Sequence, residues 1–149
     1  MKKALLLVVA IFTMSTMTIA QTNLGVRLGA GYGYGLELSG QFGMGSNRLE
    51  ADLGFSSYHN DWTYINLCGI WQWTWEISGP WGWYAGVGAN LGVYSGEYDG
   101  FGLGVAAQIG LEFNPNIPLQ FTLDVRPNWG FVGYSGFGWG AALGIRYKF

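Results

Sequence analysis

The side chains with the clearest capacity for chemistry are one histidine and a set of charged residues. His59 is the single histidine, and Ser56, Ser57 and Asp61 lie within three residues of it. A histidine beside a serine can act as a general base that activates the hydroxyl as a nucleophile. A short run of serine, asparagine and aspartate is also typical of a solvated turn, and we favour that interpretation. We therefore expect no catalytic site, with chemistry at His59 as the alternative.

The charged residues are spaced in a way that predicts ion pairing. Glu50 and Asp52 are two residues apart, and so are Asp124 and Arg126. Residues two apart in a β-strand share one face of the sheet. Such faces, brought together, could form a network of ion pairs or line a narrow path for ions.

Metal, cofactor and nucleic-acid sites are not expected. Cys68 is the single cysteine, so the chain can form neither an internal disulfide nor a cysteine cluster, and one histidine adds little to a metal site. Without Lys2 and Lys3, five basic residues remain against nine acidic ones, which gives no basic patch for nucleic acid.

Residues 1–20 are typical of a cleavable signal peptide. Lys2 and Lys3 precede an apolar run from Ala4 to Phe12, and small residues stand at Thr18 and Ala20. The apolar run is too short for a spanning helix, which needs about 18 residues or more. We expect cleavage after Ala20, which leaves residues 21–149 as one domain.

The remaining chain alternates apolar and polar residues with a period of two, which predicts β-strands. Eight such segments can be distinguished: 24–32, 34–42, 49–56, 65–77, 81–93, 101–113, 119–126 and 138–149. Of the charged residues after residue 20, ten lie on the polar side of a segment, and none lies on the apolar side. These ten are Arg27, Glu37, Glu50, Asp52, Glu76, Glu112, Asp124, Arg126, Arg146 and Lys148. The other four, Arg48, Asp61, Glu97 and Asp99, fall in expected connections.

Two further features separate a membrane barrel from a soluble β-sandwich. The polar face is mainly glycine, and all 26 glycines follow residue 20. Aromatic residues also gather near the ends of the segments, as in the two aromatic girdles of a membrane barrel. One group is Trp73, Trp75, Trp81, Trp83, Phe113, Tyr147 and Phe149, and the other is Tyr32, Tyr34, Trp62, Tyr64, Phe101 and Trp139. We therefore predict an all-β fold, an eight-stranded antiparallel up-and-down transmembrane β-barrel.

An even number of strands puts both termini on the same side, which we expect to be periplasmic. Periplasmic turns are expected at Gly43 to Asn47, Ser78 to Pro80 and Asn114 to Pro118. External connections are expected at Gly33, Ser57 to Asp61, Tyr94 to Gly100, and Pro127 to Gly136.

The chain resembles the small eight-stranded outer-membrane β-barrel proteins of Gram-negative bacteria. The resemblance is carried by Gly25 to Phe42, Ile117 to Pro127 and Gly140 to Phe149, and it spans essentially all of residues 21–149. The ending with Tyr147 and Phe149 is similar to the signal that the barrel-assembly machinery recognises. The resemblance implies an outer-membrane location, lipid as the surrounding partner, and periplasmic chaperones as partners during biogenesis. It implies no shared enzymatic activity. Some similar barrels act on lipids, and such an activity would depend on His59 in this chain.

We expect a filled, charged interior and a structural or surface-interaction role. The interior network is expected to contain Arg27, Glu37, Glu50, Asp52, Glu112, Asp124, Arg126 and Arg146, with Arg126 beside Asp124 or Glu112. A narrow pore for ions or small solutes is the alternative. A surface ligand of unknown identity could bind the expected loops through Tyr94, Glu97, Tyr98, Asp99, Trp129, Phe131 and Tyr134, although these residues also fit an extended aromatic girdle.

Overall fold

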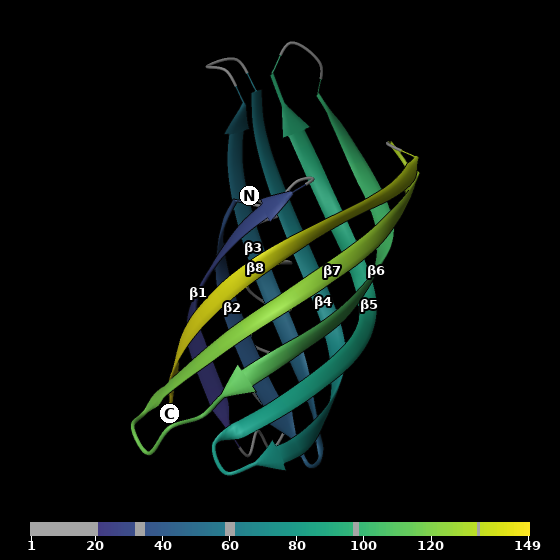
Figure 1. The fold of residues 1–149 in the computed structure, drawn as a ribbon. Coiled ribbons are helices and arrows are strands. Elements are labelled where there is room, and N and C mark those ends of the chain that lie inside the picture. The colour runs from purple at the N-terminus through teal and green to yellow at the C-terminus, as the bar shows by residue number, and fades with distance from the viewer. Residues whose placement is uncertain (1–20, 32–34, 59–61, 97–98, 134) are drawn as a thin grey trace.

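The protein forms a closed antiparallel barrel of eight strands in a computed structural model (Figure 1). The structure describes residues 21–149 except 32–34, 59–61, 97–98 and 134. The strands are β1 (Thr22–Gly31), β2 (Leu36–Met44), β3 (Asn47–Tyr58), β4 (Trp62–Ser78), β5 (Trp81–Ser95), β6 (Gly100–Phe113), β7 (Leu119–Val132) and β8 (Gly136–Lys148). No helix among the described residues has the length and hydropathy to cross a membrane.

Each strand pairs with its neighbours in sequence, and β1 pairs with β8 to close the barrel. The closing register runs from Asn23 opposite Lys148 to Gly31 opposite Gly140. The predicted fold class, an all-β eight-stranded antiparallel barrel, is therefore confirmed. Closure leaves no free sheet edge, which is the requirement that hydrocarbon places on backbone polar groups.

The strands differ in length, and this makes the barrel taller on one side. β4 has 17 residues, whereas β1 has 10 and β2 has 9. In Figure 1 the β3–β4 and β5–β6 hairpins extend at the top of the view beyond the rest of the barrel, while the C-terminus lies at the opposite end. The two ends of the molecule are therefore unlike each other.

The expected connection from Pro127 to Gly136 was wrong. β7 continues to Val132, and Pro127 pairs with Trp139 of β8. Proline removes only one backbone donor, and the alternation of polar inward and apolar outward residues continues past it with buried Asn128 and exposed Trp129. The turn expected from Gly43 to Asn47 is also shorter than predicted, because Met44 pairs with Asn47.

The polarity of the barrel is inverted relative to a water-soluble protein. Arg27, Glu50 and Arg146 are fully buried in the interior, while Leu28 is 62% exposed and Leu143 is 63% exposed on the outside. The buried side chains are mostly polar or charged, and the exposed ones include a large set of aliphatic and aromatic residues. The outer surface is thus apolar around the barrel.

Aromatic side chains line the outer surface near the end that carries the C-terminus. Trp75 stacks on Trp83 with ring centroids 4.3 Å apart, and Trp81 lies 4.8 Å from Phe113. Tyr147 contacts Phe149 at 4.9 Å. The expected grouping of aromatics at this rim agrees with these contacts.

At the other rim, the expectation for Tyr64 was wrong. Phe101 and Trp139 are exposed as expected, but Tyr64 lies next to outward-facing Ile65 and so points inward, where it stacks on Tyr94 at 5.1 Å. An inward tyrosine fits there because Gly92 beside it has no side chain; a Cβ at Gly92 would lie 2.4 Å from the Tyr64 hydroxyl oxygen. Tyr32, Tyr34 and the side chain of Trp62 lie outside the described residues.

Glycine also makes room for the fully buried ring of Tyr84. Tyr84 is fully buried, and a Cβ built on Gly110 of β6 would lie 2.5 Å from the Tyr84 ring. The inward glycine at Gly110 therefore leaves the space that the Tyr84 ring occupies.

Replacing Gly110 by valine is expected to lower the free energy of unfolding by about 1–3 kcal/mol, because the added atoms overpack the space that Tyr84 fills. Urea unfolding of the folded barrel in detergent micelles measures the effect. Gly69→Val is the matched control, because Gly69 faces outward and a Cβ there meets no atom within 4 Å. Equal destabilisation by the two changes would contradict a tight fit around Tyr84.

Candidate functional site

The centre of the barrel interior is organised around the carboxylate of Glu50. This carboxylate accepts hydrogen bonds from Gln41 at 2.7 Å, Gln108 at 2.9 Å and Gln72 at 3.0 Å. It also accepts hydrogen bonds from Arg126 at 3.0 Å and Arg146 at 3.1 Å. These five donors come from β2, β6, β4, β7 and β8, so one buried group on β3 contacts side chains from most of the barrel wall.

Arg27 and Arg126 connect three further interior carboxylates, Glu37, Asp52 and Asp124. Arg27 pairs with Glu37 and with Asp124, and its guanidinium lies 3.7 Å from Asp52. Arg126 pairs with Asp52 and lies 3.5 Å from Glu37. Each of these groups is at least nine-tenths buried, so every charge is held away from solvent and close to a group of opposite sign.

The partners of Arg126 differ from the expected ones. Arg126 contacts Glu37, Glu50 and Asp52, whereas Asp124 pairs with Arg27 and accepts a hydrogen bond from the Tyr84 hydroxyl at 3.1 Å. Sequence spacing places two residues on one face but does not say which residue lies opposite across the barrel. The partners are set by the stagger of strands that are far apart in sequence.

Arg48 belongs to the interior, although it was expected in a connection. The β2–β3 turn is short, so Arg48 is already the second residue of β3, and it points inward. Its Nη1 pairs with Glu112 at 2.6 Å, its Nε donates to Gln72, and its guanidinium lies 4.7 Å from the centre of the Tyr84 ring. The sequence did contain a signal for this inward position, because Arg48 lies two residues before Glu50 and four before Asp52 and so shares their face of the strand.

Besides Glu50, Arg146 has two neutral partners. Its Nη2 bonds the Ser39 hydroxyl at 2.7 Å, and its Nη1 bonds the Thr122 hydroxyl at 3.0 Å. A Cβ on Gly144 would lie 2.4 Å from the Thr122 hydroxyl and 3.0 Å from Arg146, so this glycine leaves space for both side chains. The interior is thus filled by side chains, as the small diameter of an eight-stranded barrel requires.

These groups do not form a recognisable catalytic or metal-binding arrangement in the part of the chain that the structure describes. The interior carboxylates bond to arginine, to carboxamide groups and, at Asp124, to the Tyr84 hydroxyl, and no cluster of potential metal ligands occurs among the described residues. His59 and Asp61, on which the catalytic alternative depends, lie outside the described residues.

The residues considered for surface recognition are distributed differently from expectation. Tyr94 is in β5 and faces inward, while Trp129 and Phe131 are in β7 and more than half exposed on the outer surface. They are therefore strand residues and not loop residues. Glu97, Tyr98 and Tyr134 lie outside the described part of the chain.

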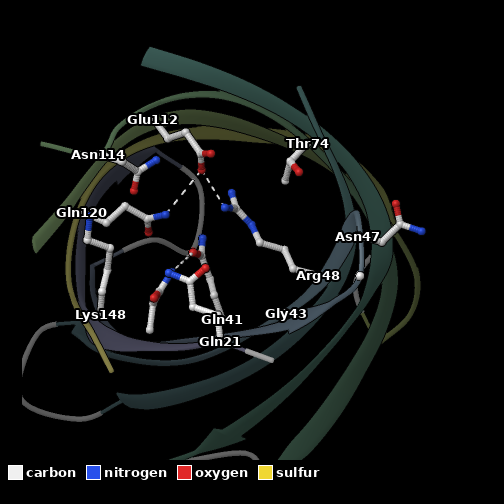
Figure 2. Close-up of a pocket in the computed structure, with 12 residues that line it drawn as sticks. Gln21, Gln41, Gly43, Asn47, Arg48, Thr74, Glu112, Asn114, Gln120 and Lys148 are labelled. Carbon is white, nitrogen blue, oxygen red and sulfur yellow. Dashed lines mark hydrogen bonds and ion pairs between the residues drawn. The ribbon is translucent and has the colours of Figure 1, made fainter. Parts of the chain in front are cut away.

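A polar hollow of about 340 Å³ opens at the end of the barrel where the short turns and the C-terminus lie. We call it the mouth hollow, and Figure 2 shows Arg48, Glu112 and Gln120 meeting in it. Its lining includes Asn23, Gln41, Arg48, Thr74, Glu112, Gln120 and Lys148. Sequence reasoning did not find this hollow, because its residues come from seven strands and include Arg48, which was assigned to a turn.

Comparisons with known proteins show the fold. No protein-family profile and no curated protein sequence matches the chain. Three similar solved structures are Neisserial surface protein A (NspA), the N-terminal β-barrel domain of Pseudomonas aeruginosa OprF, and Ail, the attachment invasion locus protein of Yersinia pestis.

The likeness extends over nearly the whole of each structure. NspA has 15% identity and a TM-score of 0.61, over 87% of this chain and 95% of that chain. The OprF barrel has 13% identity and a TM-score of 0.61, over 87% and 97%. Ail has 16% identity and a TM-score of 0.53, over 87% and 95%. The chain therefore has the fold of small eight-stranded outer-membrane barrels of Gram-negative bacteria.

Glu50→Gln is expected to destabilise the barrel by about 3–5 kcal/mol, because it removes a buried charge from its arginine partners and turns amide hydrogens toward existing donors. The free energy of unfolding in urea measures the loss. Glu76→Gln is the matched control, because the same change is made at an exposed position of β4. A loss at Glu50 no larger than that at Glu76 would show that Glu50 is not the central acceptor.

Proposed function

We propose that the protein is an integral outer-membrane barrel with a closed, charged interior and a structural or surface-interaction role. The observation that carries the proposal is the inverted polarity: arginines and carboxylates are buried inside while aliphatic side chains face outward. A belt of exposed leucine, valine and isoleucine is unfavourable in water and favourable in hydrocarbon. Charges within a membrane protein are expected to face the interior and to be paired, as they are here.

The proposal includes the route to the membrane. Residues 1–20 act as a cleaved signal peptide, and both termini of the mature chain lie on the periplasmic side. The taller β3–β4 and β5–β6 hairpins then extend outward from the cell. During assembly the chain is handled by periplasmic chaperones, and the barrel-assembly machinery recognises the ending with Tyr147 and Phe149. In support, Phe149 is 72% exposed while its backbone N–H bonds Thr22 at 2.9 Å, so the terminal ring is free to be contacted.

A surface-interaction role is favoured over a purely structural one by two observations. Exposed aromatic side chains gather toward the end opposite the C-terminus, at Phe101, Trp129, Phe131, Phe137 and Trp139. The names of two similar structures also refer to a surface protein and to an attachment invasion locus. We propose that this rim holds the barrel at the lipid headgroups and contacts a surface ligand. The proposed role is not catalytic, and in support the interior acids are held in ion pairs.

The membrane proposal is tested by electrophoretic migration of unheated and boiled samples from fractionated cells. A closed barrel in the outer membrane is expected to give a faster-migrating unheated band in the outer-membrane fraction. A single band confined to the soluble periplasmic fraction would contradict the proposal. It would favour a secreted β-sandwich arrangement of the same alternating strands.

A narrow pore for ions or small solutes is the second candidate function, and the largely polar interior is the observation that favours it. The ion pairs around Glu50 and Arg126 occupy the cross-section, so we expect no stable single-channel conductance from the purified barrel in planar lipid bilayers. The double variant Arg126→Gly/Arg146→Gly removes two large side chains and should conduct if it folds. Steady conductance of the unmodified protein would make the pore the better function.

A further inference from the structure

The interior of the barrel contains more carboxyl groups than arginines. Among the described residues, the buried side chains include five carboxyl groups and four arginines, and Arg48 pairs with Glu112 near one end. Lys148 does not supply the missing charge, because its ammonium group bonds the Pro115 carbonyl oxygen. We call the remaining residues the central cluster, and they are Arg27, Arg126, Arg146, Glu37, Glu50, Asp52 and Asp124.

The central cluster would carry a net negative charge if all of its carboxyl groups were ionised. Its members are at most 2% exposed, so solvent does not screen that charge. An uncompensated charge at a buried position is strongly destabilising. One carboxyl group of the cluster is therefore expected to be neutral.

Asp52 is the carboxyl group of the cluster with the fewest hydrogen-bond donors. Its Oδ2 accepts from Arg126, whereas its Oδ1 receives no hydrogen bond from a donor among the described residues. Glu50 accepts from five side chains. Glu37 accepts from two arginines, and Asp124 accepts from an arginine and a tyrosine. The charge of an ionised Asp52 would thus be the least compensated.

Asp52 also lies against a second carboxyl group. Asp52 and Glu50 are two residues apart in β3 and share its inner face, and their side chains are hydrogen-bonded to each other. Two ionised carboxylates can only accept, so this hydrogen bond requires a hydrogen on one of them. The five donors around Glu50 stabilise its ionised form, which assigns the hydrogen to Asp52.

We propose that Asp52 is a proton-binding site of the folded barrel, with the proton on Oδ1 and the Glu50 carboxylate as its acceptor. The bound proton leaves three arginines facing three carboxylates, so the central cluster is neutral. Asp52 and Glu50 are both 0% exposed, which leaves no room beside them for a metal ion or a water molecule. The site is additional to the structural or surface role, and it depends only on the closed barrel.

Charged and titratable groups face Asp52 from several strands. Its nearest cations, Arg126 and Arg27, also hold the other carboxylates of the cluster, so neither is available to Asp52 alone. The surrounding groups are Arg27 on β1, Glu37 on β2, Glu50 on β3, the Cys68 thiol on β4, Asp124 and Arg126 on β7, and Arg146 on β8. Loss of the proton would place two adjacent carboxylates among these groups.

A proton bound only in the folded state makes stability depend on pH in a defined direction. An aspartate of the unfolded chain is ionised above about pH 4, so folding takes up one proton. The equilibrium constant for unfolding is therefore expected to rise about tenfold per pH unit above about pH 5, until the folded barrel also releases the proton. Urea unfolding in detergent micelles, measured over a series of pH values, tests this.

Asp52→Asn distinguishes a neutral Asp52 from an ionised one. An asparagine amide can donate to Glu50 through its nitrogen and accept from Arg126 through its oxygen, as the protonated carboxyl group does. The variant is expected to match the unmodified barrel at about pH 5 and to lose the tenfold dependence on pH.

Asp124→Asn is the matched control, because the same change is made at a carboxylate that accepts from Arg27 and Tyr84. It is expected to be less stable than the unmodified barrel at every pH and to keep the pH dependence. Equal destabilisation by the two changes at about pH 5, or an unchanged pH dependence in Asp52→Asn, would overturn the proposal.

Infrared spectroscopy of the unmodified barrel, in a detergent without carbonyl groups, keeps the proposal testable even if the variants do not fold. At about pH 6 solvated carboxyl groups are ionised, so the C=O stretching band of a protonated carboxyl group reports a buried one. The band is expected in the unmodified barrel and in Asp124→Asn, and it should be missing from Asp52→Asn. Absence of the band from the unmodified barrel, or its persistence in Asp52→Asn, would overturn the proposal. Stabilisation by sodium ions without the band would overturn it as well, because a bound cation would then balance the charge.

Discussion

The carboxylate of Glu50 is the interaction on which the rest of the interior depends. It is completely buried, and it accepts hydrogen bonds from two arginines and three glutamines on five other strands. A buried carboxylate is favourable only when its charge and its lone pairs are fully compensated. The same contacts fix the orientation of Gln41, and through it that of Asn23 at the mouth hollow. One acceptor therefore organises both the centre of the barrel and one wall of its polar opening.

Much of this architecture could be predicted from the alternation of residue types. A period of two identifies strands and separates their faces, and the absence of charge on the apolar face identifies the side that meets lipid or solvent. Glu50, Asp52, Asp124 and Arg126 could be placed in the interior on this basis alone, and the structure has them buried there. Closure into a barrel follows if the strands span a membrane, because an open sheet edge is costly in hydrocarbon.

The alternation of residue types could not predict which interior side chains form ion pairs or where the strands end. Which arginine meets which carboxylate depends on the stagger across the barrel, and the Arg126 contacts show that this is not encoded in sequence spacing. Pro127 suggested the end of a strand, but the strand pairing on both sides of it outweighs one missing donor. Arg48 was misplaced because a two-residue turn and a longer loop have similar composition. The mouth hollow was missed for the same reason, since it depends on where Arg48 points.

The interior ion pairs join residues that are far apart along the chain. Arg27 and Asp124 are 97 positions apart, and Arg126 and Asp52 are 74 apart. Neighbouring hairpins can form from local contacts, but these pairs can form only when β7 has come together with β1 and β3. Until then the arginines and carboxylates need water, so the interior must stay hydrated through most of folding. The consequence concerns the order of events: water leaves the barrel in a late, concerted step, and folding is slow because its decisive contacts are non-local.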